Sequence, residues 1–568
     1  MKTKNTNRTH IILLILLLSL HFLSNVVFLK GNPFPEGKDS YAHASSFLNF
    51  AQIASSGLEH PFYVQEKGLL FSLVFTSFDY PPLFYFVSFL LNLISPLIFM
   101  NGAVLSSSLF FMLLLLGIYK IGAKMSKDTG ILAAFICSFY PIIHQTSRHF
   151  NLELATSAMV ALSIWLLVET EYFENNRYSI LLGIMLGLGM LTKQTFIVYI
   201  SVVFIFYVWI SFKVKAKNKV NHKLKRNNLL RIIGIAVIIS SIFYFNKLVF
   251  ASVAHRAFFP GAVMGGGILS LKHLLYYPFS LKNTIGLFFI LVFLMGILPN
   301  KKMDSFYRRL LFLWLIAPVV LLSFFSLKYA EYTIAVIPAM ALISSAGILA
   351  LPKRARRICI GSVCLVSLIL YAQTISGNAG SFYARYDNEK NYHVSILQVT
   401  DGNINQFNSV PELLKSMQGE NVKIGVCYDS IGLFFPTFLV KRIFAVTKMQ
   451  SAVVDLMFRT TVFFNNLDDF DFFIYVSLSQ KHWPSKQSFV EFIEENNEKC
   501  NVKVEFTDQF SNDYVFADRK KIVIAQYLVD KLISIKREYD PYCYIKFDDS
   551  ENFLSEHVYI YKFRNDDD

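Results

Sequence analysis

The chain has 568 residues, of which 54% are hydrophobic and 17% charged, and its mean hydropathy is +0.44. Soluble domains usually carry about a quarter charged residues, so the composition excludes an ordinary soluble enzyme, and many apolar runs of about 20 residues indicate membrane helices. The net charge of +14 does not indicate nucleic-acid binding, because much of it lies in short loops between apolar runs, where Lys and Arg orient membrane proteins.

The first apolar run, residues 11–29, follows a basic N-terminal segment with Lys2, Lys4 and Arg8. This order is also typical of a signal peptide, but the run is long for one and no clear small-residue cleavage site follows it. We therefore predict a retained first membrane helix with a cytoplasmic N-terminus.

Four basic loops set the predicted topology, since positively charged loops resist translocation and stay in the cytoplasm. They span residues 120–127, 213–231, 301–309 and 353–357. With these loops inside, we expect about eleven crossings. The predicted crossings are Ile11–Leu29, Val104–Tyr119, Gly130–Gln145, Leu154–Val168, Ser179–Leu191, Thr195–Phe212, Leu230–Phe250, Asn283–Leu298, Leu310–Phe325, Tyr332–Leu349 and Ile358–Ala372.

The segment 81–100 is apolar but does not fit this alternation, because only one crossing is allowed between the first outer loop and the basic loop at 120–127. Pro82 and Pro96 interrupt the segment. We therefore expect it to be re-entrant or to lie at the membrane interface, with the true crossing after it.

Several ionisable residues then lie at the outer ends of different helices. The acids are Asp39 and Glu153, and the bases are Arg148, Lys193 and Lys328. Ionisable groups at membrane depth are costly and usually functional. Their convergence on one face predicts a site in which the bases bind a phosphate and an acid activates a nucleophile.

Each of these residues also has a simpler interpretation. A lone lysine at a helix end is typical of a snorkelling anchor, and Glu331 is expected to be a local partner of Lys328. Asp79, two residues before Pro81, is typical of a helix start.

The metal dependence of the predicted site stays open. His43 lies four residues after Asp39, so on a helix the two would share a face. Asp39, His43 and Glu153 together are candidate ligands for a divalent cation, but no strict ligand motif requires one.

From about residue 376 the composition becomes charged and mixed, and the apolar runs shorten to strand length. This pattern predicts a soluble α/β domain at 376–568, outside the membrane, that recognises the acceptor, covers the site or is purely structural. The predicted strands are Lys423–Tyr428, Phe472–Val476, Val502–Phe506, Ile522–Ala525 and Val558–Tyr561, with helices at Ser488–Asn496 and Gln526–Ile535. Three of the six cysteines, Cys427, Cys500 and Cys543, lie here, and one disulfide among them is allowed.

Residues 1–375 then form a helical membrane domain with a long first outer loop at 30–80. Within it, four segments in order resemble the C-type membrane glycosyltransferases, specifically the branch with protein O-mannosyltransferases and the bacterial lipid A aminoarabinose transferase. The segments are Gly37–Tyr41 (GKDSY), Asp79–Tyr85 (DYPPLFY), Gly187–Lys193 (GLGMLTK) and Phe324–Lys328 (FFSLK) with Tyr332 and Pro338. Together they cover about residues 1–350.

The resemblance implies a polyprenyl-phosphate sugar donor and inversion at the anomeric carbon. Asp39 matches the first-loop acid that deprotonates or orients the acceptor, and Glu153 matches the second acid, which is usually Asp. Lys328 matches a basic residue near the donor phosphate, and Lys193 lies where the family has Thr-Lys-Gly, with Gln194 in place of that Gly.

Further residues are candidates for positioning the substrates or the phosphate. Arg148 is a candidate phosphate ligand, and His43, Asp79, Tyr80 and Tyr332 are candidate positioning residues. Mannosyltransferases of this family typically carry Asp-Glu in the first loop. Here Asp39 is followed by Ser40, which favours the bacterial lipid-modifying or general branch.

The sequence thus predicts an inverting glycosyltransferase in a bacterial cell membrane, with its site and C-terminal domain outside the cytoplasm and its acceptor a lipid such as lipopolysaccharide, a glycan or a protein of the cell envelope. No cofactor is expected, and whether a divalent cation takes part stays open. The alternatives are a transporter or flippase for lipid-linked sugars and a non-catalytic membrane scaffold. No clear inverted repeat supports a transporter.

Overall fold

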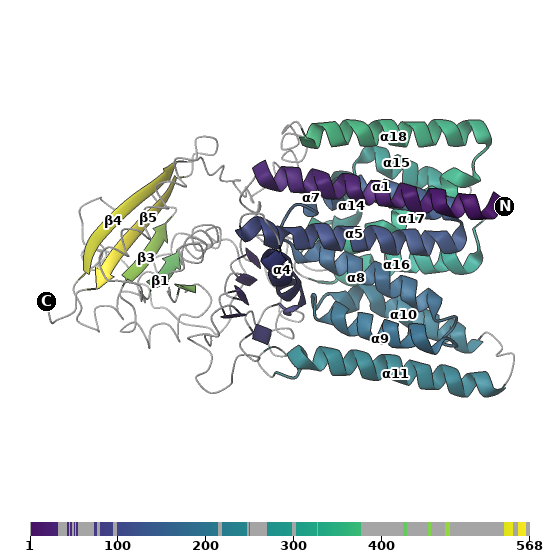
Figure 1. The fold of residues 1–568 in the computed structure, drawn as a ribbon, viewed down its shortest axis with the longest axis horizontal. Coiled ribbons are helices and arrows are strands. Elements are labelled where there is room, and N and C mark those ends of the chain that lie inside the picture. Colours follow the sequence, from purple (N-terminus) through teal and green to yellow (C-terminus); the bar gives the residue numbers. More distant parts are fainter. Residues whose placement is uncertain are drawn as a thin grey trace. The chain divides into compact units, whose positions relative to one another are not determined.

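The computed structural model describes two compact units (Figure 1), of which the first comprises Met1–Pro35 and Leu73–Asn391 and the second Glu36–Ser72 and Tyr392–Asp568. The described residues are 2–31, 43–44, 46–47, 50–51, 53–54, 73–75, 80–94, 99–213, 219–246, 249, 270–297, 303–325 and 328–375, and five strands of the second unit.

The first unit is helical, and its long helices run side by side. In chain order they are α1 (Lys2–Gly31), α4 (Leu83–Ile94), α5 (Phe99–Met125), α6 (Lys127–Ser138), α7 (Pro141–Thr146), α8 (Leu152–Glu169), α9 (Asn176–Met190), α10 (Phe196–Lys213), α11 (Lys219–Tyr244), α13 (Leu271–Leu274), α14 (Tyr276–Thr284), α15 (Leu287–Ile297), α16 (Ser305–Ser323), the 3-10 helix η2 (Ala330–Ala335), α17 (Ile337–Ala350) and α18 (Lys353–Ile375).

Every apolar run expected to cross the membrane overlaps one of these helices. Seven described helices are long and apolar enough to span a bilayer, or eight if the bent pair α14–α15 is one span. The segment 81–100 contains the short helix α4, and the helix after it, α5, is long enough to cross. The predicted crossing at 130–145 is divided into α6 and α7, with Pro141 at the start of α7, where proline is tolerated. The count of eleven crossings stays a prediction.

Helix α8 forms the centre of the bundle. Of its 18-residue window 83% is buried, against 11% for α18, and it packs against α5, α9, α10 and η2. A helix that is apolar all round must be buried by protein or lipid. The protein surrounds α8, whereas α1, α11 and α18 leave rows of Leu, Ile and Val side chains exposed, as lipid-facing helices do.

Glycines permit close helix contacts in the bundle. A Cβ on Gly347 of α17 would lie 2.2 Å from the Cα of Gly296 in α15, so the two backbones touch where these helices cross. In α9, Gly183 and Gly187 are four residues apart, and a Cβ on either would collide with isoleucines of α11. Small residues at this spacing are a usual way for membrane helices to approach each other.

The second unit contains a five-stranded sheet in the order β2-β1-β3-β5-β4. Its strands are β1 (Ile424–Tyr428), β2 (Val453–Asp455), β3 (Phe472–Ser477), β4 (Tyr539–Asp548) and β5 (Ser555–Phe563). β1 pairs in parallel with β2 and β3, while β5 is antiparallel to β3 and β4. Three predicted strands coincide with β1, β3 and β5. The predicted strands at 502–506 and 522–525 and both predicted helices lie outside the described residues.

The strand order constrains the cysteines of this unit. Cys427 lies on β1 and Cys543 on β4, with β3 and β5 between them. Three strand spacings separate these cysteines by about 14 Å, twice the largest Cα separation of about 7 Å that a disulfide spans. A Cys427–Cys543 disulfide is therefore excluded, and Cys500 lies outside the described part of the chain.

Candidate functional site

A buried ion pair joins Glu153 and Lys193, two of the residues predicted to form the site. The Lys193 ammonium donates to Oε1 of Glu153, and each side chain is 7% exposed. Burial opposes the charged form of Lys193, but the Glu153 carboxylate outweighs this effect, so the pKa of Lys193 is raised. Lys193 is therefore protonated, and its positive charge is already neutralised by its contact with Glu153.

The local sequence fixes both partners. Glu153 lies in the first turn of α8, where the Asn151 side chain caps the helix by accepting from the Glu153 backbone N–H at 3.0 Å. A carboxylate is favoured there by the partial positive charge of the helix N-terminus. Lys193 lies in the tight turn between α9 and α10. A Cβ on Gly189 would lie 2.5 Å from the ring of Phe196, so this glycine lets the turn close.

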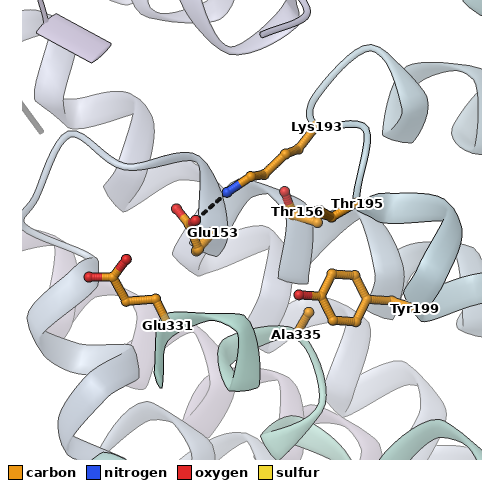
Figure 2. A pocket seen from close by; sticks show the side chains of 7 residues that line it. All are labelled: Glu153, Thr156, Lys193, Thr195, Tyr199, Glu331 and Ala335. Atoms are coloured by element: carbon orange, nitrogen blue, oxygen red, sulfur yellow. Dashed lines mark hydrogen bonds and ion pairs between the residues drawn. The ribbon is translucent and has the colours of Figure 1, made fainter. Parts of the chain in front are cut away.

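A narrow recess lies beside the ion pair. It is lined by Glu153, Thr156, Lys193, Thr195, Tyr199, Glu331 and Ala335. Figure 2 shows Lys193 reaching Glu153, with Tyr199 of α10 and Glu331 of η2 at other edges of the same space. Oε2 of Glu153 is buried and has no hydrogen-bond partner within the described ranges. This oxygen is therefore available to accept a hydrogen bond from a hydroxyl group.

Aromatic residues enclose Lys193. Its ammonium lies 5.8 Å from the ring centre of Tyr80 and 5.4 Å from that of Tyr332, and Tyr199 donates its hydroxyl to the Tyr332 carbonyl at 3.0 Å. The Tyr80 segment is tied to the turn by a backbone bond from Leu83 N–H to the Leu191 carbonyl at 3.1 Å. The structure thus brings together four predicted site residues: Tyr80, Glu153, Lys193 and Tyr332.

Lys328 is in a different electrostatic state. It is 8% exposed and donates to the Leu322 carbonyl at the end of α16, at 2.7 Å, and its ammonium lies 5.1 Å from the ring centre of Tyr277. No described carboxylate forms an ion pair with it, so the expected pair with Glu331 is wrong. Burial lowers the pKa of Lys328 to about 8. A buried ammonium without a counter-ion is a ready partner for an anion.

Arg148 is held by the first helix. Its Nε donates to Asn25 at 3.0 Å, its Nη2 donates to Ser24 at 2.7 Å, and the guanidinium lies 4.8 Å from the ring centre of Phe28. It does not line the recess at Glu153. These contacts dock α1 onto the turn before α8, and a phosphate contact by Arg148 stays a prediction.

The structure does not test the other three predicted residues. His43 is a buried residue of the second unit, and Asp39 and Asp79 lie outside the described residues. Within the described ranges, no group of three or more His, Cys, Asp or Glu side chains is placed to hold a metal ion. The roles of His43, Asp39 and Asp79 stay predictions.

Three residues near the site carry no sequence signal that singles them out. Tyr199 is one of 29 tyrosines and lies within an apolar helix, and His273 and Tyr277 precede or begin helix α14 in a segment without a motif. Glu331 was noticed in the sequence, but only as a partner for Lys328. In each case the relevant neighbour is distant along the chain, so only the fold reveals it.

Known proteins resemble the chain in part of its sequence and in its fold. Residues 79–240 match the family described as dolichyl-phosphate-mannose-protein mannosyltransferase. ArnT from Cupriavidus metallidurans bound to undecaprenyl phosphate is 13% identical with a TM-score of 0.54, and the same protein in the apo state is 13% identical with a TM-score of 0.56. Each comparison covers 82% of this chain and 93% of ArnT. No curated protein sequence matches.

Proposed function

The predicted resemblance to the C-type membrane glycosyltransferases is confirmed by the family match and the fold, and from this premise we propose that the protein is an inverting glycosyltransferase. It moves a monosaccharide from a polyprenyl-phosphate carrier to a hydroxyl of a lipid, glycan or protein acceptor. The reaction takes place at the outer face of the membrane.

This proposal rests on the difference in charge pairing between the two buried lysines, Lys193 and Lys328. Lys193 is neutralised by Glu153, whereas Lys328 has no acidic partner among the described residues and is poised at a pKa of about 8. A buried, unpaired cation is costly, and an incoming phosphate would remove that cost. The similar fold of ArnT, solved with undecaprenyl phosphate bound, supports a lipid phosphate as the anion.

The reaction needs little acid catalysis. The acceptor oxygen attacks the anomeric carbon, the bond from that carbon to the phosphate oxygen breaks, and the polyprenyl phosphate leaves with one further negative charge. Lys328 stabilises this developing charge, which electrostatic contacts do most effectively where water is excluded. The acceptor proton passes to a carboxylate.

We assign that proton transfer to an acid of the recess or its first outer loop. Asp39 is the base by its match to the family motif. Glu153, which pairs with Lys193 through Oε1 and whose Oε2 has no hydrogen-bond partner among the described residues, accepts a hydrogen bond from the acceptor hydroxyl and orients it. Tyr80 and Tyr332 form the aromatic wall against which the substrates lie.

The test is sugar transfer in proteoliposomes that contain the purified protein, a labelled polyprenyl-phosphate sugar and a membrane extract of acceptors. The variants are Asp39→Asn, Glu153→Gln and Lys328→Ala, and Lys282→Ala, at the end of α14, is the matched control. We expect transfer by the wild type and the control, no transfer by the Asp39 variant, and a raised donor KM for the Lys328 variant.

Each result separates the competing functions. Label that changes leaflet without changing chemical form would indicate a flippase and refute the enzyme. Full activity of Asp39→Asn would remove Asp39 as the base. An unchanged donor KM in Lys328→Ala would remove its contact with the phosphate.

A further inference from the structure

A buried histidine lies beside Lys328 without a role in the reaction described above. His273 belongs to the short helix α13 and has no exposed surface. Ser270 caps this helix by accepting from the His273 backbone N–H at 3.3 Å. The Ser323 hydroxyl of α16 is shared between the Val319 carbonyl of its own helix at 2.8 Å and the Leu274 carbonyl of α13 at 3.2 Å. The backbone of α13 therefore lies against the end of α16, five residues before Lys328.

The hydrogen bonds of His273 define which ring nitrogen is protonated. Nε2 lies 3.0 Å from the Phe325 carbonyl, and because a carbonyl only accepts, Nε2 must donate. Burial and the nearby charge of Lys328 lower the pKa of His273, so the ring is neutral. Nδ1 is then an unprotonated acceptor, and it is buried without a hydrogen-bond partner in the described part of the chain. Buried acceptors usually receive a hydrogen bond, so a ligand or a water is expected to donate one to Nδ1.

Two neighbouring side chains, Tyr277 and Lys328, add hydrogen-bond donors next to this acceptor. The hydroxyl of Tyr277 is also buried, with no hydrogen-bond partner among the residues that the structure describes, and its ring lies against the Lys328 ammonium. Lys328 offers N–H donors, the Tyr277 hydroxyl offers another, and His273 Nδ1 requires one. A ligand that satisfies all three must present anionic oxygens together with a hydroxyl donor. Inorganic phosphate and a bare lipid phosphate offer such a donor only while the phosphate itself is protonated, whereas a sugar joined to the lipid phosphate always offers one from its own hydroxyls.

This ligand chemistry is that of a sugar joined to a phosphate. We propose that His273 is a specificity-determining residue whose Nδ1 accepts a hydrogen bond from a hydroxyl of the donor sugar, while Lys328 and Tyr277 hold the phosphate. The inference rests on the proposed function, since it places the donor at Lys328. It adds that the protein distinguishes the sugar-bearing polyprenyl phosphate from the polyprenyl phosphate that remains after transfer. The distinguishing group is a sugar hydroxyl close to the phosphate.

Two substitutions separate the two sides of the imidazole. In His273→Gln, the amide nitrogen takes the place of Nε2 and keeps the bond to Phe325, but the acceptor is lost. In His273→Asn, the amide oxygen takes the place of Nδ1 and keeps the acceptor. Dissociation constants are measured for undecaprenyl phosphate and for its mannosyl, glucosyl and 4-amino-arabinosyl derivatives, and the tightest derivative is used for comparison.

One hydrogen bond to a neutral acceptor corresponds to about a twofold to tenfold change in binding. We expect His273→Gln to lower the preference for the sugar-bearing lipid over undecaprenyl phosphate by this factor, with the affinity for undecaprenyl phosphate unchanged, and His273→Asn to keep most of the preference. In the wild type, one monodeoxy analogue of the sugar should show the same loss, and His273→Gln should not weaken that analogue further.

The proposal is overturned if His273→Gln keeps the wild-type preference, if it weakens both lipids equally, or if no monodeoxy analogue binds the wild type less well. If the wild type nevertheless transfers sugar, these results would leave the proposed function intact. They would then indicate that Nδ1 binds a buried water. If the wild type binds none of these lipids, the proposed function falls as well.

Discussion

The Glu153–Lys193 ion pair allows a quantitative test of what holds the site together. Lys193→Met removes the ammonium but leaves the Glu153 carboxylate, which is 7% exposed, without a cation. Removing one partner of a buried pair typically costs about 3–5 kcal/mol, because the other charge remains buried and uncompensated. Solvent screening is small at this exposure, so the full range applies. Glu153→Gln should be costly for the same reason, since it leaves Lys193 alone.

The double variant Glu153→Gln/Lys193→Met should recover most of the loss. Replacing both charges by groups of similar volume is often neutral in stability, so we expect the double variant to lie within about 1 kcal/mol of the wild type. All three variants should nevertheless be defective in sugar transfer. The free energy of unfolding is measured at equilibrium in mixed micelles, and transfer is measured in proteoliposomes.

Two results would refute this reasoning. If each single substitution costs less than about 1 kcal/mol, the pair is more hydrated than its burial indicates. If the cost of the double variant equals the sum of the single costs, the two side chains are not coupled, and their role in the site must be independent.

Three further predictions follow from individual contacts. Binding of undecaprenyl phosphate should be strongest below pH 8 and weaken as the pH rises through the pKa of Lys328, about 8, because only the ammonium attracts the phosphate. Lys328→Arg should flatten this pH profile of binding. A flat profile for the wild type would contradict the assignment of Lys328 to the phosphate. Gly347→Ala should destabilise the bundle because its Cβ would overlap Gly296, whereas Gly361→Ala, with open space around it, should be neutral or stabilising in thermal unfolding. Arg148→Met should loosen α1 and increase proteolysis near it at about 1–3 kcal/mol cost, and unchanged protection would show that the arginine is not the anchor.

The helices were predictable because their signal is local. Each predicted crossing overlaps a helix, since a run of apolar residues and a basic loop are both read directly along the chain. Helix α14 and its bend against α15 were not predicted, because the expected crossing begins only at Asn283 and the residues before it are less apolar. Strand β4 was also missed: Tyr539–Asp548 contains Pro541 and three charged residues, and a strand of this composition depends on its pairing with β5.

For the site, the sequence predicted which charged residues take part but not how they pair. Glu153, Lys193 and Lys328 stand out in the sequence because charge is rare near membrane helices, but their pairing depends on which turns meet in space. The sequence placed Glu331 with Lys328 on proximity alone, whereas the fold places Glu331 at the Glu153 recess. The acceptor state of His273 depends on the carbonyl of Phe325, 52 residues away, and no sequence pattern carries that information.

The contacts of Arg148 with α1 also bear on the position of one predicted acid. Arg148 holds the last turns of α1 through Ser24 and Asn25, and Asp39 follows the end of this helix, Gly31, by eight residues. A fully extended segment of this length reaches about 28 Å. The anchored end of α1 therefore limits how far from Gly31 the carboxylate of Asp39 can lie. Since we propose Asp39 as the base, we expect a substitution at Arg148 to slow sugar transfer as well, through the position of α1.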